Sequence, residues 1–155
     1  MISELKRILL VEDDPRDVEL ILAALAEYNL ANEVVVSGDG EEALDYLHNR
    51  GKFQGRPGGN PAVVLLDLKI PKVSGMEVLK QMRQDERLKI TPVVVLTSSR
   101  EEKDWVESYK LGVNAYVVKP VDFHDFVEAV KELGVFWAVI NEPPPGSVGN
   151  VKRAV

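Results

Sequence analysis

Five short runs of aliphatic, mostly branched residues alternate along this chain with segments whose apolar residues recur at helical spacing. Such alternation predicts a parallel sheet covered on both faces by helices, with right-handed crossovers between strands. The chain has 155 residues, enough for one domain with its own core, and it lacks Cys, so no disulfide is expected. The predicted strands are Lys6–Val11, Glu33–Ser37, Ala62–Leu66, Thr91–Thr97 and Ala115–Val118.

Each predicted helix begins at a side chain that can accept hydrogen bonds from the free N–H groups of the first turn. The predicted caps are Asp14, Asp39, Ser74, Ser99 and Asp122. Pro15 suits the first position of the first helix, and the two serines are each followed by Glu three residues later, the capping-box pattern. The helix after Ser99 carries Trp105, Val106, Tyr109 and Leu111, and we expect Gly112 to end it.

Three further features of the sequence concern an exposed loop and the partners that the charge and hydropathy exclude. The segment Lys52–Pro61 contains four Gly or Pro among residues 55 to 59, which predicts an exposed loop. The net charge of -6 gives no basic surface for nucleic acid or for an anionic membrane. The longest apolar run, Val135–Ile140, is too short to cross a bilayer. We therefore expect a cytoplasmic protein with no nucleic-acid or membrane partner.

Charged and polar side chains follow four of the predicted strands. Glu12 and Asp13 end the first, Asp67 follows the third, and Thr97 and Lys119 end the fourth and fifth. Each has a simple structural explanation when taken alone: Asp67 could cap a turn, Thr97 could be only a strand end, and Lys119 is one of 19 basic residues. In a parallel sheet, however, the carboxyl ends of all strands lie along one edge, where open α/β sheets keep their sites.

Carboxylates crowded at one edge repel one another unless a cation offsets their charge. Mg²⁺ fits best, because it prefers oxygen ligands and commonly binds one or two carboxylates together with phosphate oxygens. Lys119 adds a point charge that can contact a phosphoryl oxygen, and Thr97 adds a hydroxyl donor. Asp14 is better explained as a cap than as a ligand.

Four segments resemble the receiver domain of two-component response regulators, in order and in spacing. They are Val11–Pro15, Leu66–Gly75, Leu96–Ser98 and Ala115–Pro120, within a resemblance that covers about residues 5 to 135. The resemblance implies a flavodoxin-like, doubly wound (βα)5 fold with strand order 2-1-3-4-5. It also implies that a histidine kinase transfers a phosphoryl group to Asp67, and that the protein is a phosphoacceptor rather than an enzyme with a separate substrate.

The same resemblance assigns roles to the strand-end residues. It implies that Asp13 and Asp67 bind Mg²⁺ directly, that the Lys69 backbone carbonyl is a further ligand, and that Glu12 assists through water. Glu12 stands where Asp is commoner, so its direct ligation is in question.

In the resulting mechanism, Asp67 attacks phosphorus in line while Mg²⁺ and Lys119 offset charge on the transferred group. Thr97 then turns inward, and Tyr116 moves into the vacated space as a switch. The alternative for Tyr116 is a ring that only covers a strand edge. Lys119–Pro120 is expected to be a cis peptide.

The C-terminal part suggests a partner surface. The last helix is expected to run from Phe123 to about Ile140, and its apolar end, with Phe136 and Trp137, cannot all face one core. Either the Pro-rich segment Asn141–Val155 folds back over it or the chain forms a homodimer through Phe136, Trp137 and Ile140, which we favour. These elements resemble stand-alone regulators that partner phytochromes. We expect a receiver domain at 1–140, a Pro-rich tail at 141–155 and no effector domain.

Two other classes place related residues at this edge. An aspartyl-phosphate hydrolase of the haloacid dehalogenase type normally has a second Asp two residues after the nucleophile, where this chain has Lys69. A flavodoxin-type cofactor binder needs a hydroxyl-rich phosphate loop after the first strand, where Glu12, Asp13 and Asp14 would repel phosphate. Both are therefore disfavoured.

Overall fold

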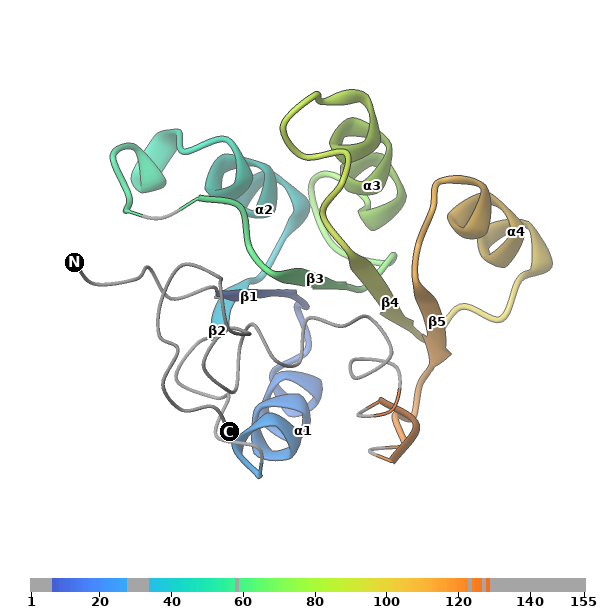
Figure 1. Cartoon of the computed structure of the whole chain (residues 1–155). Coiled ribbons are helices and arrows are strands. Elements are labelled where there is room, and N and C mark those ends of the chain that lie inside the picture. The colour runs from blue at the N-terminus through green and yellow to red at the C-terminus, as the bar shows by residue number, and fades with distance from the viewer. Residues whose placement is uncertain (1–6, 28–33, 58, 123, 127, 129–155) are drawn as a thin grey trace, which may run out of the picture.

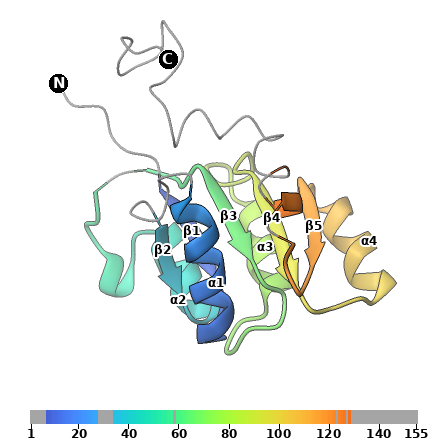
Figure 2. The ribbon, with the colours of Figure 1, turned by 90° about the horizontal axis from the view of Figure 1, so that it is seen from below.

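Five parallel strands form one sheet in the order β2-β1-β3-β4-β5 in the computed structural model, which describes residues 7–27, 34–57, 59–122, 124–126 and 128 (Figure 2). The strands are β1 (Ile8–Val11), β2 (Val34–Ser37), β3 (Val63–Leu66), β4 (Val93–Thr97) and β5 (Ala115–Val118). The predicted fold class and strand order are confirmed. β4 begins two residues later than predicted, because the Thr91 N–H donates to Leu88 O in a turn and Pro92 has no N–H to give.

Helices cover both faces of this sheet, as Figure 1 shows. They are α1 (Pro15–Ala26), α2 (Gly40–Leu47), α3 (Gly75–Gln84) and α4 (Glu102–Lys110), with a short 3₁₀ turn, η2, at Gly51–Phe53. In Figure 1, α2, α3 and α4 lie on one side and α1 on the other. Successive residues of each strand pack on opposite faces of the sheet. Leu9 and Val64 pack with α2 and α3, whereas Ile8 and Leu65 pack with α1 and Phe126.

Three of the predicted caps are formed by the side chains that the sequence indicated. The N–H groups of Arg16, Glu42 and Glu77 donate to Asp14, Asp39 and Ser74, respectively. At Asp122, the side chain accepts from Asp125 N at 3.1 Å and the carbonyl accepts from Phe126 N at 2.9 Å, so a helical turn begins there as predicted. The rest of the predicted last helix lies outside the described residues.

The predicted capping box at Ser99 and Glu102 is wrong. α4 begins at Glu102, its N-cap is Glu101, and no side chain caps it. The Ser99 hydroxyl instead donates to Asp104 at 2.6 Å. The structure places the start of the helix after the loop, so Ser99 lies too early to serve its free N–H groups.

α4 also presents its apolar residues to solvent. Trp105, Val106 and Tyr109 are 48%, 37% and 46% exposed, while Ser108 is buried. The periodicity correctly indicated a helix, and Gly112 follows its end with φ 77°. Fewer apolar residues of α4 face the core than the pattern implied.

The segment Lys52–Pro61 is only partly the exposed loop that was predicted. It contains part of η2, and the Arg56 guanidinium stacks on the Tyr46 ring, 3.8 Å from its centroid, while donating to Tyr46 O at 2.9 Å. Phe53 meets the same ring edge-on at 5.1 Å. Among the described residues, no helix has the length and apolar character needed to span a membrane.

Candidate functional site

The residues at the strand ends are held by backbone hydrogen bonds that continue the sheet beyond the strands. The N–H of Glu12 donates to Ser37 O at 3.0 Å, and the N–H of Asp67 donates to Val11 O at 3.0 Å. On the other side, the N–H of Lys119 donates to Thr97 O at 2.8 Å. The parallel ladder therefore fixes the register of these residues along one edge.

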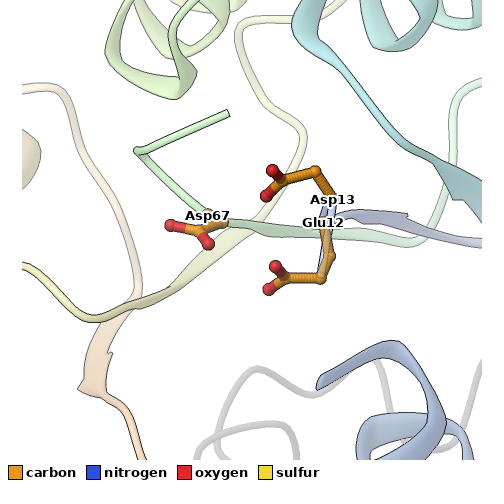
Figure 3. A group of neighbouring side chains, drawn as sticks. All are labelled: Glu12, Asp13 and Asp67. Carbon is orange, nitrogen blue, oxygen red and sulfur yellow. The ribbon is translucent and has the colours of Figure 1, made fainter. Parts of the chain in front are cut away.

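Three carboxylates gather at this edge. One carboxylate oxygen from each of Glu12, Asp13 and Asp67 lies within 4.8 Å of the other two. Figure 3 shows Glu12 and Asp13 leaving the end of β1 in opposite directions, with Asp67 projecting beyond the end of β3. Glu12 and Asp67 are only 2% and 5% exposed, whereas Asp13 is open to solvent.

Lys119 offsets much of this negative charge. Its Nζ donates to Asp67 Oδ2 at 2.8 Å, Glu12 Oε1 at 2.5 Å and Asp17 Oδ2 at 2.9 Å. An ammonium group has three N–H donors, so all three are used. The predicted convergence of Glu12, Asp67 and Lys119 is confirmed.

The buried charges have displaced pKa values. Burial tends to lower the pKa of Lys119, but its hydrogen bonds to Asp67, Glu12 and Asp17 outweigh that effect and raise it above its ordinary range. Burial raises the pKa of Glu12, with the Asp67 charge adding to the rise against the bond to Lys119. The pKa values of both partners can rise together. Three carboxylates stabilise the charged form of Lys119, whereas Glu12 is buried and has only a third share of one cation to stabilise its charged form.

The donor set suits a hard divalent cation. All three side chains offer carboxylate oxygens, and Asp13 keeps the group open to water, as Mg²⁺ requires when it retains part of its hydration shell. Asp14 is not part of this group: its Oδ1 accepts from Arg16 N at 2.8 Å, as expected for a cap. The Lys69 N–H donates to Asp67 Oδ1 at 3.0 Å. The role of the Lys69 carbonyl as a metal ligand stays a prediction.

Thr97 and Tyr116 are connected through the β4–α4 loop. The buried Thr97 hydroxyl oxygen accepts from Ser99 N at 3.2 Å, and the Tyr116 hydroxyl donates to Ser99 O at 3.2 Å. Burial raises the pKa of Tyr116, so its hydroxyl stays a donor at neutral pH. The Ser99 side chain reaches α4 through Asp104, so the loop joins the site to that helix.

Sequence reasoning missed two of these contacts. Asp17 was not identified as a site residue, although it lies in the first turn of α1, just after the cap Asp14. Ser99 was assigned as a cap. The predicted interface residues Phe136, Trp137 and Ile140 lie outside the described residues.

The profile of the response regulator receiver domain matches residues 8–131 of this sequence. The chain belongs to the response regulator receiver family. This membership confirms the predicted family and sets aside the flavodoxin and haloacid dehalogenase alternatives. It also places the protein among signalling proteins of two-component systems.

The structural neighbours share nearly the whole chain. The bacteriophytochrome response regulator RtBRR is 64% identical with a TM-score of 0.80, covering 93% of this chain and 87% of its own. The phosphorylated cyanobacterial phytochrome response regulator RcpA is 41% identical with a TM-score of 0.73, covering 86% and 94%.

Rcp1 from Synechocystis is 39% identical in sequence over 85% of this chain and 88% of its own. The Mn²⁺-bound form of Rcp1 has a TM-score of 0.73 at 37% identity, covering 90% of this chain and 99% of that one. The receiver family therefore includes relatives of this chain that are described as phosphorylated and as metal-bound.

Proposed function

We propose that this protein accepts a phosphoryl group on Asp67 from a phosphohistidine of a sensor kinase, with Mg²⁺ at the group formed by Glu12, Asp13 and Asp67. The observation that carries the proposal is the Asp67 carboxylate itself. It is 5% exposed, bonded to Lys119 Nζ at 2.8 Å and set beside two other carboxylates at the sheet edge. Family membership and the phosphorylated relative RcpA support it.

The transfer forms one bond and breaks one bond. An Asp67 carboxylate oxygen attacks phosphorus in line as the phosphorus–nitrogen bond of the donor breaks, and its electron pair leaves with the imidazole. Lys119 neutralises charge on the transferred group, and the backbone N–H of Lys69 orients the Asp67 carboxylate. When bound, Mg²⁺ supplies further charge compensation at the phosphoryl oxygens.

The metal site is proposed with Asp13 and Asp67 as direct ligands, the Lys69 carbonyl as a third, and Glu12 acting through water. Glu12 is given the indirect role because it stands where Asp is commoner in the family. Its oxygens accept from Lys119 Nζ and Asp14 N, just as the Asp67 oxygens accept from Lys119 Nζ and Lys69 N. The Mn²⁺-bound form of Rcp1 supports a divalent cation in this family.

The output is a rearrangement of the β4–α4 loop. The Thr97 hydroxyl gives up Ser99 N as it turns toward the new phosphoryl oxygens, and Tyr116, which holds Ser99 O, follows. The loop then moves relative to α4, whose exposed Trp105, Val106 and Tyr109 offer an apolar surface to a partner.

A phytochrome-type kinase is the proposed donor, supported by the phytochrome response regulators RtBRR and RcpA among the structural neighbours. The protein is further proposed to act in the cytoplasm as a homodimer through Phe136, Trp137 and Ile140.

One labelling experiment tests the acceptor. The wild type and Asp67→Asn are incubated with ³²P-labelled acetyl phosphate and Mg²⁺, and the protein-bound label is tested for loss in base and retention in acid. We expect label on the wild type alone, with the lability of an acyl phosphate. Equal labelling of Asp67→Asn would show that another residue is the acceptor.

The kinase is tested separately. Purified phytochrome-type and unrelated sensor kinases, each autophosphorylated, are mixed with the wild type over a short time course. Faster transfer from the phytochrome-type kinases is expected, and equal rates from unrelated kinases would refute the assignment of the partner.

A further inference from the structure

Lys119 has one acceptor that does not belong to the carboxylate group at the metal site. Its Nζ bonds to Glu12, Asp67 and Asp17, and the first two belong to the group whose oxygens lie within 4.8 Å of one another. Asp17 stands apart from them, in the first turn of α1. The three carboxylates that bond to Lys119 therefore differ in what else they contact when the cation and the phosphoryl group are bound.

The partners of the Asp67 and Glu12 carboxylates change during the proposed reaction. Asp67 binds the cation and then becomes an acyl phosphate, so its oxygens are no longer free to hold the ammonium as they do here. Glu12 lies beside the same cation. Asp17 has neither task, and its side chain is 30% exposed compared with 1% for Glu12 and 6% for Asp67. Water can therefore solvate the Asp17 carboxylate while it still accepts from Lys119.

We propose that Asp17 is a positioning residue that keeps the Lys119 ammonium at the phosphoryl site once Asp67 and Glu12 are engaged by the cation and the phosphoryl group. The inference rests on the proposed phosphorylation of Asp67. Lysine has a flexible four-carbon stem and no planar fork to fix it, so an anchor in the loaded state matters more for this residue than it would for arginine.

The start of α1 is built to hold this anchor in place. Asp14 caps the helix through Arg16 N at 2.8 Å, and Pro15 occupies the first turn with its fixed φ. The cap follows directly on Glu12 and Asp13, so the first turn of α1 stays next to the end of β1. Asp17 thereby connects α1 to the residue that follows β5.

The experiment compares Asp17→Asn with the wild type, using the rate of labelling by acetyl phosphate at saturating Mg²⁺. The loss of a hydrogen bond to a charged group is expected to slow labelling about tenfold. Asp17→Glu should recover most of the rate, because it restores the carboxylate. The matched control is Asp14→Asn, which removes one charge from the same turn but keeps a good cap and does not touch Lys119; it should label at the wild-type rate.

Two further measurements separate positioning from a structural role. In a Lys119→Gln background, Asp17→Asn should have no additional effect, because the lysine through which it acts is absent. Titration calorimetry should give a Mg²⁺ affinity for Asp17→Asn within about twofold of the wild type, since Asp17 is not a ligand. If the Lys119→Gln protein labels too slowly to compare, the rescue by Asp17→Glu decides.

Three outcomes would overturn the inference: wild-type labelling by Asp17→Asn, no rescue by Asp17→Glu, or an equal loss from Asp17→Asn with and without Lys119. All three leave the labelling of wild-type Asp67 intact, so they are distinct from failure of the proposed function. Absence of label at Asp67 in the wild type would overturn both.

Discussion

Gly75 lies where α3 touches the segment that carries the phosphoacceptor, and replacing it by Ala should damage both the fold and the site. A Cβ at Gly75 would lie 2.1 Å from the Asp67 carbonyl oxygen and 2.6 Å from Leu68 Cα. Close contacts between carbon and a carbonyl oxygen normally measure about 3.3–3.6 Å, so the backbone would have to part by roughly 1 Å. Both neighbours are backbone atoms, so no side-chain rotation can relieve the clash.

The size of the effect follows from this displacement. Forcing extra volume into a packed region costs about 1–3 kcal/mol, which for a chain of this length lowers the melting temperature by about 2–12 °C. A shift of about 1 Å in a reacting group can cost on the order of 100-fold in rate. Gly75→Ala should therefore label far more slowly than its modest loss of stability would suggest.

The assay combines thermal unfolding with labelling by acetyl phosphate and Mg²⁺ at a temperature where all variants are folded. Gly38→Ala is the matched control, because a Cβ there meets nothing within 4 Å. It should melt and label as the wild type does. Wild-type melting and labelling by Gly75→Ala would refute the reasoning, since the close approach would then impose no constraint.

Three other predictions concern stability and assembly. Arg83→Lys should cost about 2 kcal/mol, because the guanidinium bonds to Leu111 O at 2.6 Å and to Thr91 O at 2.8 Å, and a lysine cannot span both. The midpoint of urea unfolding should fall with an unchanged m-value, and an unaltered midpoint would contradict this role. Burial lowers the pKa of His48, so the unfolded chain takes up its proton first as pH falls below about 6.5. The wild type should then lose stability over that range more steeply than His48→Gln, and parallel pH profiles from urea midpoints would exclude the effect. Trp137→Glu should shift the protein toward monomer in sedimentation. An unchanged mass would refute the proposed dimer interface.

Local patterns predicted the helix starts wherever the capping residue stands next to the first turn. Asp14 and Ser74 are examples, because the bond from a cap to its helix spans only two or three residues. The prediction of Ser99 as a cap was wrong, because the position of Ser99 relative to α4 depends on a loop that is held by hydrogen bonds to Thr97 and Tyr116. A motif of adjacent residues contains no information about such contacts across the sheet.

The candidate site divides in the same way. Asp67, Asp13, Glu12 and Lys119 were predicted because parallel strands bring their carboxyl ends to one edge, so topology alone places them together. Asp17 could not be predicted as a partner of Lys119, since a distance of 2.9 Å between residues 102 positions apart depends on how α1 packs against the sheet.

The amino-acid sequence by itself determined the alternation of strands and helices, the parallel direction of the strands and the acidic edge, because these follow from periodicity and from the ends of strands. The strand order was expected only from the resemblance to receiver domains. Only the tertiary structure decided which charges pair and how closely Gly75 approaches Asp67. It also decided that the apolar residues of α4 face solvent. Those features depend on packing between segments far apart in the chain, and differences of about 1 Å in that packing decide whether the groups make contact.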